Sequence, residues 1–140
     1  MSKWFGRNED RLADLGVRPP DRFTPPPMDQ CAKPVDTDMD IGDGRIIHVV
    51  QVESSRRLVF FSLQLDAMIE GVRQSISRID SKHGEIHQHF YRRGIYDAKR
   101  PRELIAVIPV DNPSRFLDDA YVDAFDTLVD NAESLIEGWH

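Results

Sequence analysis

The chain has 140 residues, which is enough for one domain and a tail. Hydrophobic residues make up 40% of it, as in soluble globular proteins. No apolar run approaches the roughly 20 residues that cross a bilayer, and the charged start MSKWFGRNED lacks the apolar stretch of a secretory signal. The single cysteine, Cys31, excludes an internal disulfide framework and fits a reducing compartment. These features predict a cytoplasmic protein that does not bind membranes.

The net charge of −6 comes almost entirely from one end of the chain. Residues 111–140 contain one Lys/Arg against eight Asp/Glu. Because nucleic-acid binding depends on neutralising phosphates, this distribution argues against a protein that coats nucleic acid broadly. It is compatible with a local basic surface elsewhere on the molecule.

The first part of the chain is rich in proline. Residues 17–34 contain six prolines, which lack the N–H group that helices and central strands need. We therefore predict an N-terminal arm over residues 1–40, with a short helix at residues 8–15 followed by a proline-rich linker. A compact domain is predicted over residues 41–140.

Strand-like segments follow the arm. They share β-branched and apolar residues bounded by turn signals, and they cover residues 46–52, 58–69, 72–80, 85–92 and 104–110. Glu70-Gly71 is typical of a tight hairpin turn, since glycine readily adopts a positive φ. The short spacing between successive segments indicates antiparallel neighbours.

The last segment has the pattern of a helix. Asp111-Asn112-Pro113 supplies capping side chains and a proline suited to the first turn. Apolar residues then recur at spacings of three and four from Leu117 to Trp139, which predicts one helix of roughly 25 residues. The sequence therefore predicts an α+β fold, an antiparallel β-meander of about five strands with one long C-terminal helix packed on one face.

Residues 83–89 read HGEIHQH and contain three of the five histidines. If both intervening turns are tight, Leu63 lies opposite Arg78, and Arg78 lies opposite His87. This register places four ionisable side chains on the core face of the sheet, toward one end: Arg78, Asp80, His87 and His89. Because ionisable groups are not buried without partners, these four side chains must have some means of compensating their desolvation.

Three interpretations of this group remain open. The first is a structural network whose members satisfy one another's hydrogen bonds and charges. The second is a catalytic or ligand-binding cleft, and the third is a divalent metal site. Two histidines on one side of a strand are common in metal sites, and a third ligand would come from His83, Asp80 or Glu85.

The stretch QLDAMIEGVRQSISRIDSKHGEIHQHFYRRG resembles TumE-type toxins of toxin–antitoxin pairs, and related actinobacterial domains with an HG-x-x-H core and a closing helix. The matching positions are Arg78, Asp80, His83, Gly84, His87 and His89. Where TumE-like sequences continue from the aspartate into an asparagine and a Pro-His-His step, this chain has Asp80-Ser-Lys-His-Gly. The resemblance covers residues 45–138 and implies a bacterial cytosolic protein that acts on RNA or nucleotides.

Two functional hypotheses follow, and the sequence leaves open whether the protein is an enzyme. In the first, a toxin-like domain acts on RNA without a metal or cofactor, and its catalytic residues are Arg78, Asp80, His83, His87 and His89. His87 and His89 would be the acid and base, Arg78 would bind phosphate and Asp80 would orient an imidazole. In the second, a non-enzymatic module binds a protein partner through the proline-rich arm and the acidic helix, or forms a homodimer through an exposed strand edge at residues 46–52 or 104–110.

Overall fold

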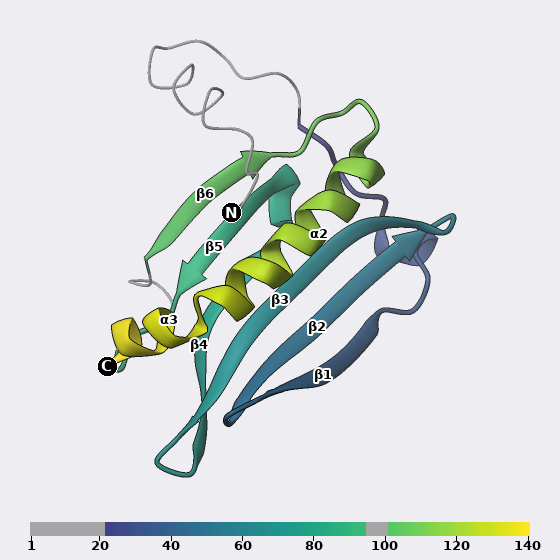
Figure 1. The fold of residues 1–140 in the computed structure, drawn as a ribbon. Helices are drawn as coiled ribbons and strands as arrows, with labels where there is room; N and C mark the ends of the chain where they lie inside the picture. The colour runs from purple at the N-terminus through teal and green to yellow at the C-terminus, as the bar shows by residue number, and fades with distance from the viewer. Residues whose placement is uncertain (1–21, 95–100) are drawn as a thin grey trace, which may run out of the picture.

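The computed structural model describes residues 22–94 and 101–140 of the chain. The short helix expected at residues 8–15 lies outside the described residues. Six antiparallel strands form one sheet in which each strand is hydrogen-bonded to the next in the chain (Figure 1). The strands are β1 (Val35–Gly42), β2 (Arg45–Ser54), β3 (Arg57–Ile69), β4 (Val72–Asp80), β5 (Glu85–Phe90) and β6 (Arg102–Val107). The predicted α+β meander is confirmed.

The hairpin between β3 and β4 forms where the sequence predicted it. Glu70 and Gly71 have φ values of 54° and 78°, as a two-residue hairpin turn requires, and Ile69 pairs with Val72. The next hairpin turns through η2 (Lys82–Gly84), a short 3₁₀ segment. The predicted strand boundaries agree with the structure to within about three residues at each end of the five expected strands.

The C-terminal helix is divided in two. α2 (Pro113–Asp130) and α3 (Ala132–Trp139) are separated at Asn131, whose φ and ψ of −106° and 10° are not helical. The prediction of one long helix is therefore wrong at this residue. The Asn131 side chain donates from Nδ2 to the carbonyl oxygen of Thr127 at 2.9 Å, a local bond of the kind by which Asn competes with the helical ladder.

The start of α2 agrees with the prediction in part. Pro113 lies in the first turn, where its missing N–H costs nothing. Asn112 adopts a left-handed conformation, with φ of 49°, and its side chain makes no capping hydrogen bond. The expectation that the Asn112 side chain caps the helix is therefore wrong.

The hydrophobic core lies between the sheet and the helices. α2 and α3 cross one face of the sheet (Figure 1). Phe61, Leu63 and Leu65 of β3 are completely buried beneath them, and Phe61 meets Tyr121 of α2 edge-to-face at 5.7 Å between ring centroids. Further core residues come from the other strands and from α2, and they include Ile47, Val49, Ile79, Ile86, Ala106, Leu117, Ala124 and Leu128.

The sheet begins earlier than the sequence predicted. β1 pairs with β2 from Val35 onward, in a stretch that the sequence analysis assigned to the arm, and it supplies a sixth strand. Its side chains are almost all exposed and alternate Asp36, Asp38 and Asp40 with apolar neighbours, as on a solvated edge strand. β1 also covers the edge of β2 that we expected to be exposed.

The described part of the arm packs on the sheet face opposite α2 and α3, and η1 (Met28–Gln30) lies behind β2 and β3 in Figure 1. The backbone N–H of Ala32 donates to the carbonyl of Glu53 at 2.8 Å, and that of Phe23 donates to the carbonyl of Ile108 at 3.4 Å. The arm passes so close to Gly84 that a Cβ there would lie 2.6 Å from the Phe23 carbonyl oxygen. Residues 22–34 are thus a packed part of the domain.

Within the described ranges, no helix has both the length and the apolar character needed to span a bilayer.

Candidate functional site

A β-bulge in β4 decides which way the predicted site residues point. Leu65 pairs with Ser77 and Asp66 pairs with Ser75, so Ile76 has no partner of its own. This extra residue shifts the register by one, and Leu63 lies opposite Ile79 instead of Arg78. The prediction that the ionisable group shares the core face with Phe61 and Leu63 is therefore wrong.

The group lies on the opposite face, which we call the polar face: the side of the sheet turned away from α2 and α3. Its members remain neighbours, because Asp80 pairs with His87 and Arg78 pairs with His89. These partners differ by two residues from the expected ones. Because side chains alternate along a strand, a shift of two leaves His87 and His89 on the same face as Arg78 and Asp80. One cross-strand row on the polar face runs over all six strands and consists of Asp38, His48, Gln64, Arg78, His89 and Arg102.

Asp80 is the centre of the contacts in this group, and its side chain is only 5% exposed. Its Oδ2 accepts a hydrogen bond from Nε of Arg78 at 3.0 Å and lies 3.3 Å from Nε2 of His89. Its Oδ1 accepts a bond from the backbone N–H of Lys82 at 3.2 Å. A buried carboxylate with these partners is satisfied, and it fixes the position of His89.

His87 lies beside His89 and has a carboxylate of its own. The two imidazole centroids are 6.3 Å apart. Nε2 of His87 lies 3.5 Å from Oε1 of Glu85, and the other oxygen of Glu85 binds Nη1 of Arg22 at 2.9 Å. Arg22 comes from the arm, so the arm contributes a cation to the surroundings of the histidine pair.

Burial lowers the pKa of His87 below its usual value of 6.5. The charges of Glu85 and Asp80 act in the opposite direction, while those of Arg102 and Arg22 lower the pKa further. The net direction is downward, so the imidazole is neutral at pH 7.

Burial also lowers the pKa of His89, with added lowering from Arg78, His87 and Arg102, against the opposing effect of Asp80. Both imidazoles are therefore neutral at pH 7, and each has one nitrogen able to accept a proton. A neutral imidazole pair beside several guanidinium groups has the composition of an acid–base site for an anionic substrate.

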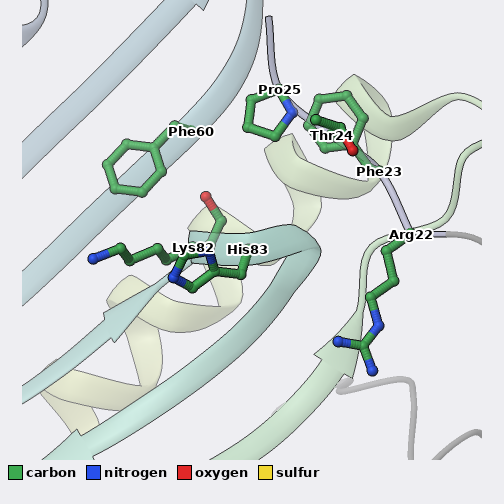
Figure 2. Close-up of a pocket in the computed structure, with 8 residues that line it drawn as sticks. Arg22, Phe23, Thr24, Pro25, Phe60, Lys82 and His83 are labelled. Atoms are coloured by element: carbon green, nitrogen blue, oxygen red, sulfur yellow. The ribbon is translucent and has the colours of Figure 1, made fainter. Parts of the chain in front are cut away.

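His83 does not join this group. It belongs to η2, has a positive φ of 61°, and lines a pocket of about 410 Å³ between the arm and the sheet. Figure 2 shows His83 and Lys82 on one side of this pocket, with Phe60 and Pro25 on the other. The structure thus brings four of the five predicted site residues together and places the fifth in a neighbouring pocket.

A second polar network, which the sequence analysis did not find, lies toward the β1 edge of the polar face. Arg73 binds Asp66 through Nε at 2.8 Å and Asp38 through Nη1 and Nη2 at 2.9 and 3.0 Å. Nδ1 of His48 lies 2.7 Å from Asp38. The hydrogen bonds from Arg73 and His48 hold the pKa of Asp38 well below its usual range. Because its charges are mutually paired, this network ties β1, β2, β3 and β4 together.

Three residues near the histidine pair were not assigned to it from the sequence: Arg22, Glu85 as an ion-pair partner, and Arg102. Arg22 and Arg102 are distant in sequence from the HGEIHQH motif, and no local spacing links them to it.

Among the described residues, no group of three or more His, Cys, Asp or Glu side chains is arranged to hold a metal ion. Comparison of the chain with protein-family models, with curated proteins and with solved structures finds no match. The case for a function therefore depends on the geometry of the site.

Proposed function

We propose that this protein is a toxin-like ribonuclease that cleaves single-stranded RNA without a metal, using His87 and His89 as its acid–base pair. The observation that carries the proposal is the placement of two neutral imidazoles 6.3 Å apart beside Asp80, with guanidinium groups around them. An RNA phosphodiester can be cleaved by moving two protons and stabilising a charged phosphorus centre, and these side chains can do both.

His89 is the base in this proposal. It takes the proton from a ribose 2′-hydroxyl, whose oxygen then forms a bond to the adjacent phosphorus. Asp80, 3.3 Å from His89, stabilises the positive charge that the imidazole gains.

His87 is the acid. The bond from phosphorus to the 5′-oxygen breaks, and His87 gives its proton to that leaving oxygen, so the products are a 2′,3′-cyclic phosphate and a 5′-hydroxyl. A bound phosphate anion beside His87 raises the pKa of the imidazole and supplies the protonated form that this role needs.

The charges around the histidine pair suit the binding of RNA to the polar face. Arg78 binds Asp80 through Nε, and the Nη groups of its guanidinium are the donors that would bind a phosphate oxygen. Arg102 follows His89 in the cross-strand row. The exposed acids of the helices lie on the opposite side of the sheet, and they are Asp118, Asp119, Asp126, Asp130, Glu133 and Glu137. The negative charge of the two helices therefore lies on the other side of the sheet from the proposed RNA-binding face, and the exposed aspartates of β1 lie at the opposite edge of the sheet from β6.

The resemblance to TumE-type toxins supports the same proposal. It implies an RNA- or nucleotide-directed activity for Arg78, Asp80, His87 and His89, and these four side chains are neighbours on the polar face. A binding module that works through the proline-rich arm is less well supported, because residues 22–34 pack against the protein's own sheet.

Cleavage of a fluorogenic single-stranded RNA oligonucleotide tests the proposal. We expect His87→Ala/His89→Ala to lose activity by about 10²-fold or more, since each acid–base group typically contributes 10²- to 10⁴-fold. Growth arrest on expression in bacteria should disappear in the same variant.

The matched control is His48→Gln, which changes a histidine of the same cross-strand row that lies in the second polar network. This variant should cleave at the wild-type rate. Circular dichroism of all three proteins checks that they are folded. If the double variant is folded and cleaves as fast as the wild type, the proposed function is wrong.

A further inference from the structure

The pocket beneath the arm adjoins the histidine pair. Asp80 ends β4, and Ser81, Lys82 and His83, which follow it directly, line the pocket. Phe60 lies on β3 two residues before Ser62, the cross-strand partner of Asp80. Since alternate residues of a strand share a face, Phe60 projects from the same polar face as Asp80.

Arg22 connects the two places physically. It lines the pocket, and its guanidinium reaches Glu85, which in turn lies beside His87. Arg22 and Glu85 thus link the pocket to His87, and a nucleotide chain with its phosphate at the histidines is expected to reach this pocket with a neighbouring base.

The walls of the pocket suit a flat aromatic group with a nearby negative charge. Phe60 and Pro25 form apolar walls, and the imidazole of His83 lies across from Phe60 (Figure 2). Lys82 and Arg22 supply positive charge. At about 410 Å³ the pocket is in the size range of small-molecule sites.

The surroundings of Phe60 make its ring available as a platform. Phe60 and Pro25 are half-buried, and both also line a second, apolar pocket of about 460 Å³ together with other residues of the arm. Aromatic rings at the wall of a pocket, such as that of Phe60, stack with unpaired bases in single-strand recognition.

We propose that this pocket, lined by Phe60, Pro25 and His83, binds one unpaired nucleobase of the RNA strand whose phosphate lies at His87 and His89. The inference rests on the proposed function for the identity of the strand, but the binding of a base can be measured without cleavage.

The probes are adenosine 5′-monophosphate and uridine 5′-monophosphate, compared with ribose 5-phosphate, which has the sugar and phosphate but no base. None of them contains a phosphodiester to cleave. We expect both nucleotides to bind at least about fivefold more tightly than ribose 5-phosphate in calorimetric or NMR titrations, because stacking of one base contributes roughly 5- to 150-fold in affinity.

Phe60→Leu removes the aromatic face and keeps an apolar side chain, and it should reduce nucleotide affinity to that of ribose 5-phosphate. Phe60→Tyr retains the ring and should bind nucleotides as the wild type does, which separates loss of stacking from loss of folding. Phe125→Leu changes a half-buried phenylalanine of α2 on the far side of the sheet and should leave binding unchanged.

The outcomes separate this inference from the proposed function. Nucleotide binding that depends on Phe60, in a protein that cleaves no RNA, supports the base pocket and overturns the ribonuclease. Cleavage that depends on His87 and His89, with nucleotides binding no more tightly than ribose 5-phosphate, overturns the base pocket and leaves the ribonuclease standing.

Discussion

The two faces of the sheet are built from the same strands and differ in what holds them together. On the helix-covered face, Phe61, Leu63 and Leu65 are completely buried among many apolar neighbours. On the polar face, the buried ionisable groups are Asp66, Asp80 and His87, and each depends on one to three specific partners. Apolar burial is non-directional, whereas a buried charge needs particular partners, so substitutions on the first face should change stability and those on the second should change chemistry.

Among substitutions that test this difference between the two faces, Phe61→Ala should cause the largest loss of stability. Phe61 is fully buried against Tyr121, so removing its ring leaves a cavity in the core. We expect the free energy of unfolding in urea to fall by about 3–5 kcal/mol.

Ser62→Ala, one residue further along β3 and on the polar face, is the control. Its free energy of unfolding should change by less than about 1 kcal/mol, as for most substitutions outside a core. Equal losses in the two variants would show that the faces do not differ as we describe.

The helix-covered face was also the part of the molecule that the sequence predicted well. Its apolar alternation along β3 and the three- and four-residue spacing along α2 are repeated signals, and any one residue could be misread without changing the result. β1 was missed because three aspartates in eight residues are unusual in a strand, although their alternation with Val35, Thr37, Met39 and Ile41 is the pattern of an exposed edge.

The face of the sheet on which the site residues lie depended on one local feature, the β-bulge at Ile76. In a regular strand Ile76 and Ile79 cannot share a face, because they are three residues apart, yet both are buried. A bulge at Ile76 resolves this conflict, and the odd spacing of the two isoleucines was the signal that could have predicted it. The grouping of Arg78, Asp80 and His89 was predictable, because Arg78 and Asp80 both follow the bulge on β4. The pairing of β4 with β5 differs from the expected one by two residues, which keeps His89 on the same face.

The arm joins the polar face to the rest of the molecule, and Gly84→Ala should disturb it. Gly84 has a φ of 73°, and a Cβ would lie 2.6 Å from the Phe23 carbonyl oxygen, so both strain and a clash with backbone result. We expect a loss of about 1–3 kcal/mol in the free energy of unfolding. Faster proteolysis of the arm should accompany it.

Gly138→Ala in α3 is the matched control, because a Cβ at Gly138 meets no atom within 4 Å. Alanine favours the helix there, so this variant should be as stable as the wild type or more stable by up to about 1 kcal/mol. An arm that resists proteolysis equally in both variants would contradict the role we give to Gly84.

The smallest expected effect is a dependence of stability on pH that comes from the histidine pair. Burial lowers the pKa of His87 and of His89 in the folded state below 6.5, against the opposing charges of Asp80 and Glu85. Well above pH 6.5 both imidazoles are neutral in the folded and unfolded chains and contribute nothing to the pH dependence. As the pH falls below 6.5, the unfolded chain binds protons that the folded protein resists, so the folded state loses stability until the pH has passed below the folded pKa values.

His87→Gln/His89→Gln removes both titrating groups and keeps side chains able to form hydrogen bonds. In urea titrations between pH 7 and pH 5, the wild type should lose more stability than this variant, by less than about 1.4 kcal/mol per pH unit for each histidine. Carboxylates distant from the histidines titrate alike in both proteins, so their contribution cancels in the difference, whereas Asp80 and Glu85 contact the replaced side chains. If the plots of unfolding free energy against pH were parallel for the two proteins, the folded protein would not resist protonation of the histidine pair. The proposal that a neutral imidazole serves as the base at pH 7 would then lose its support.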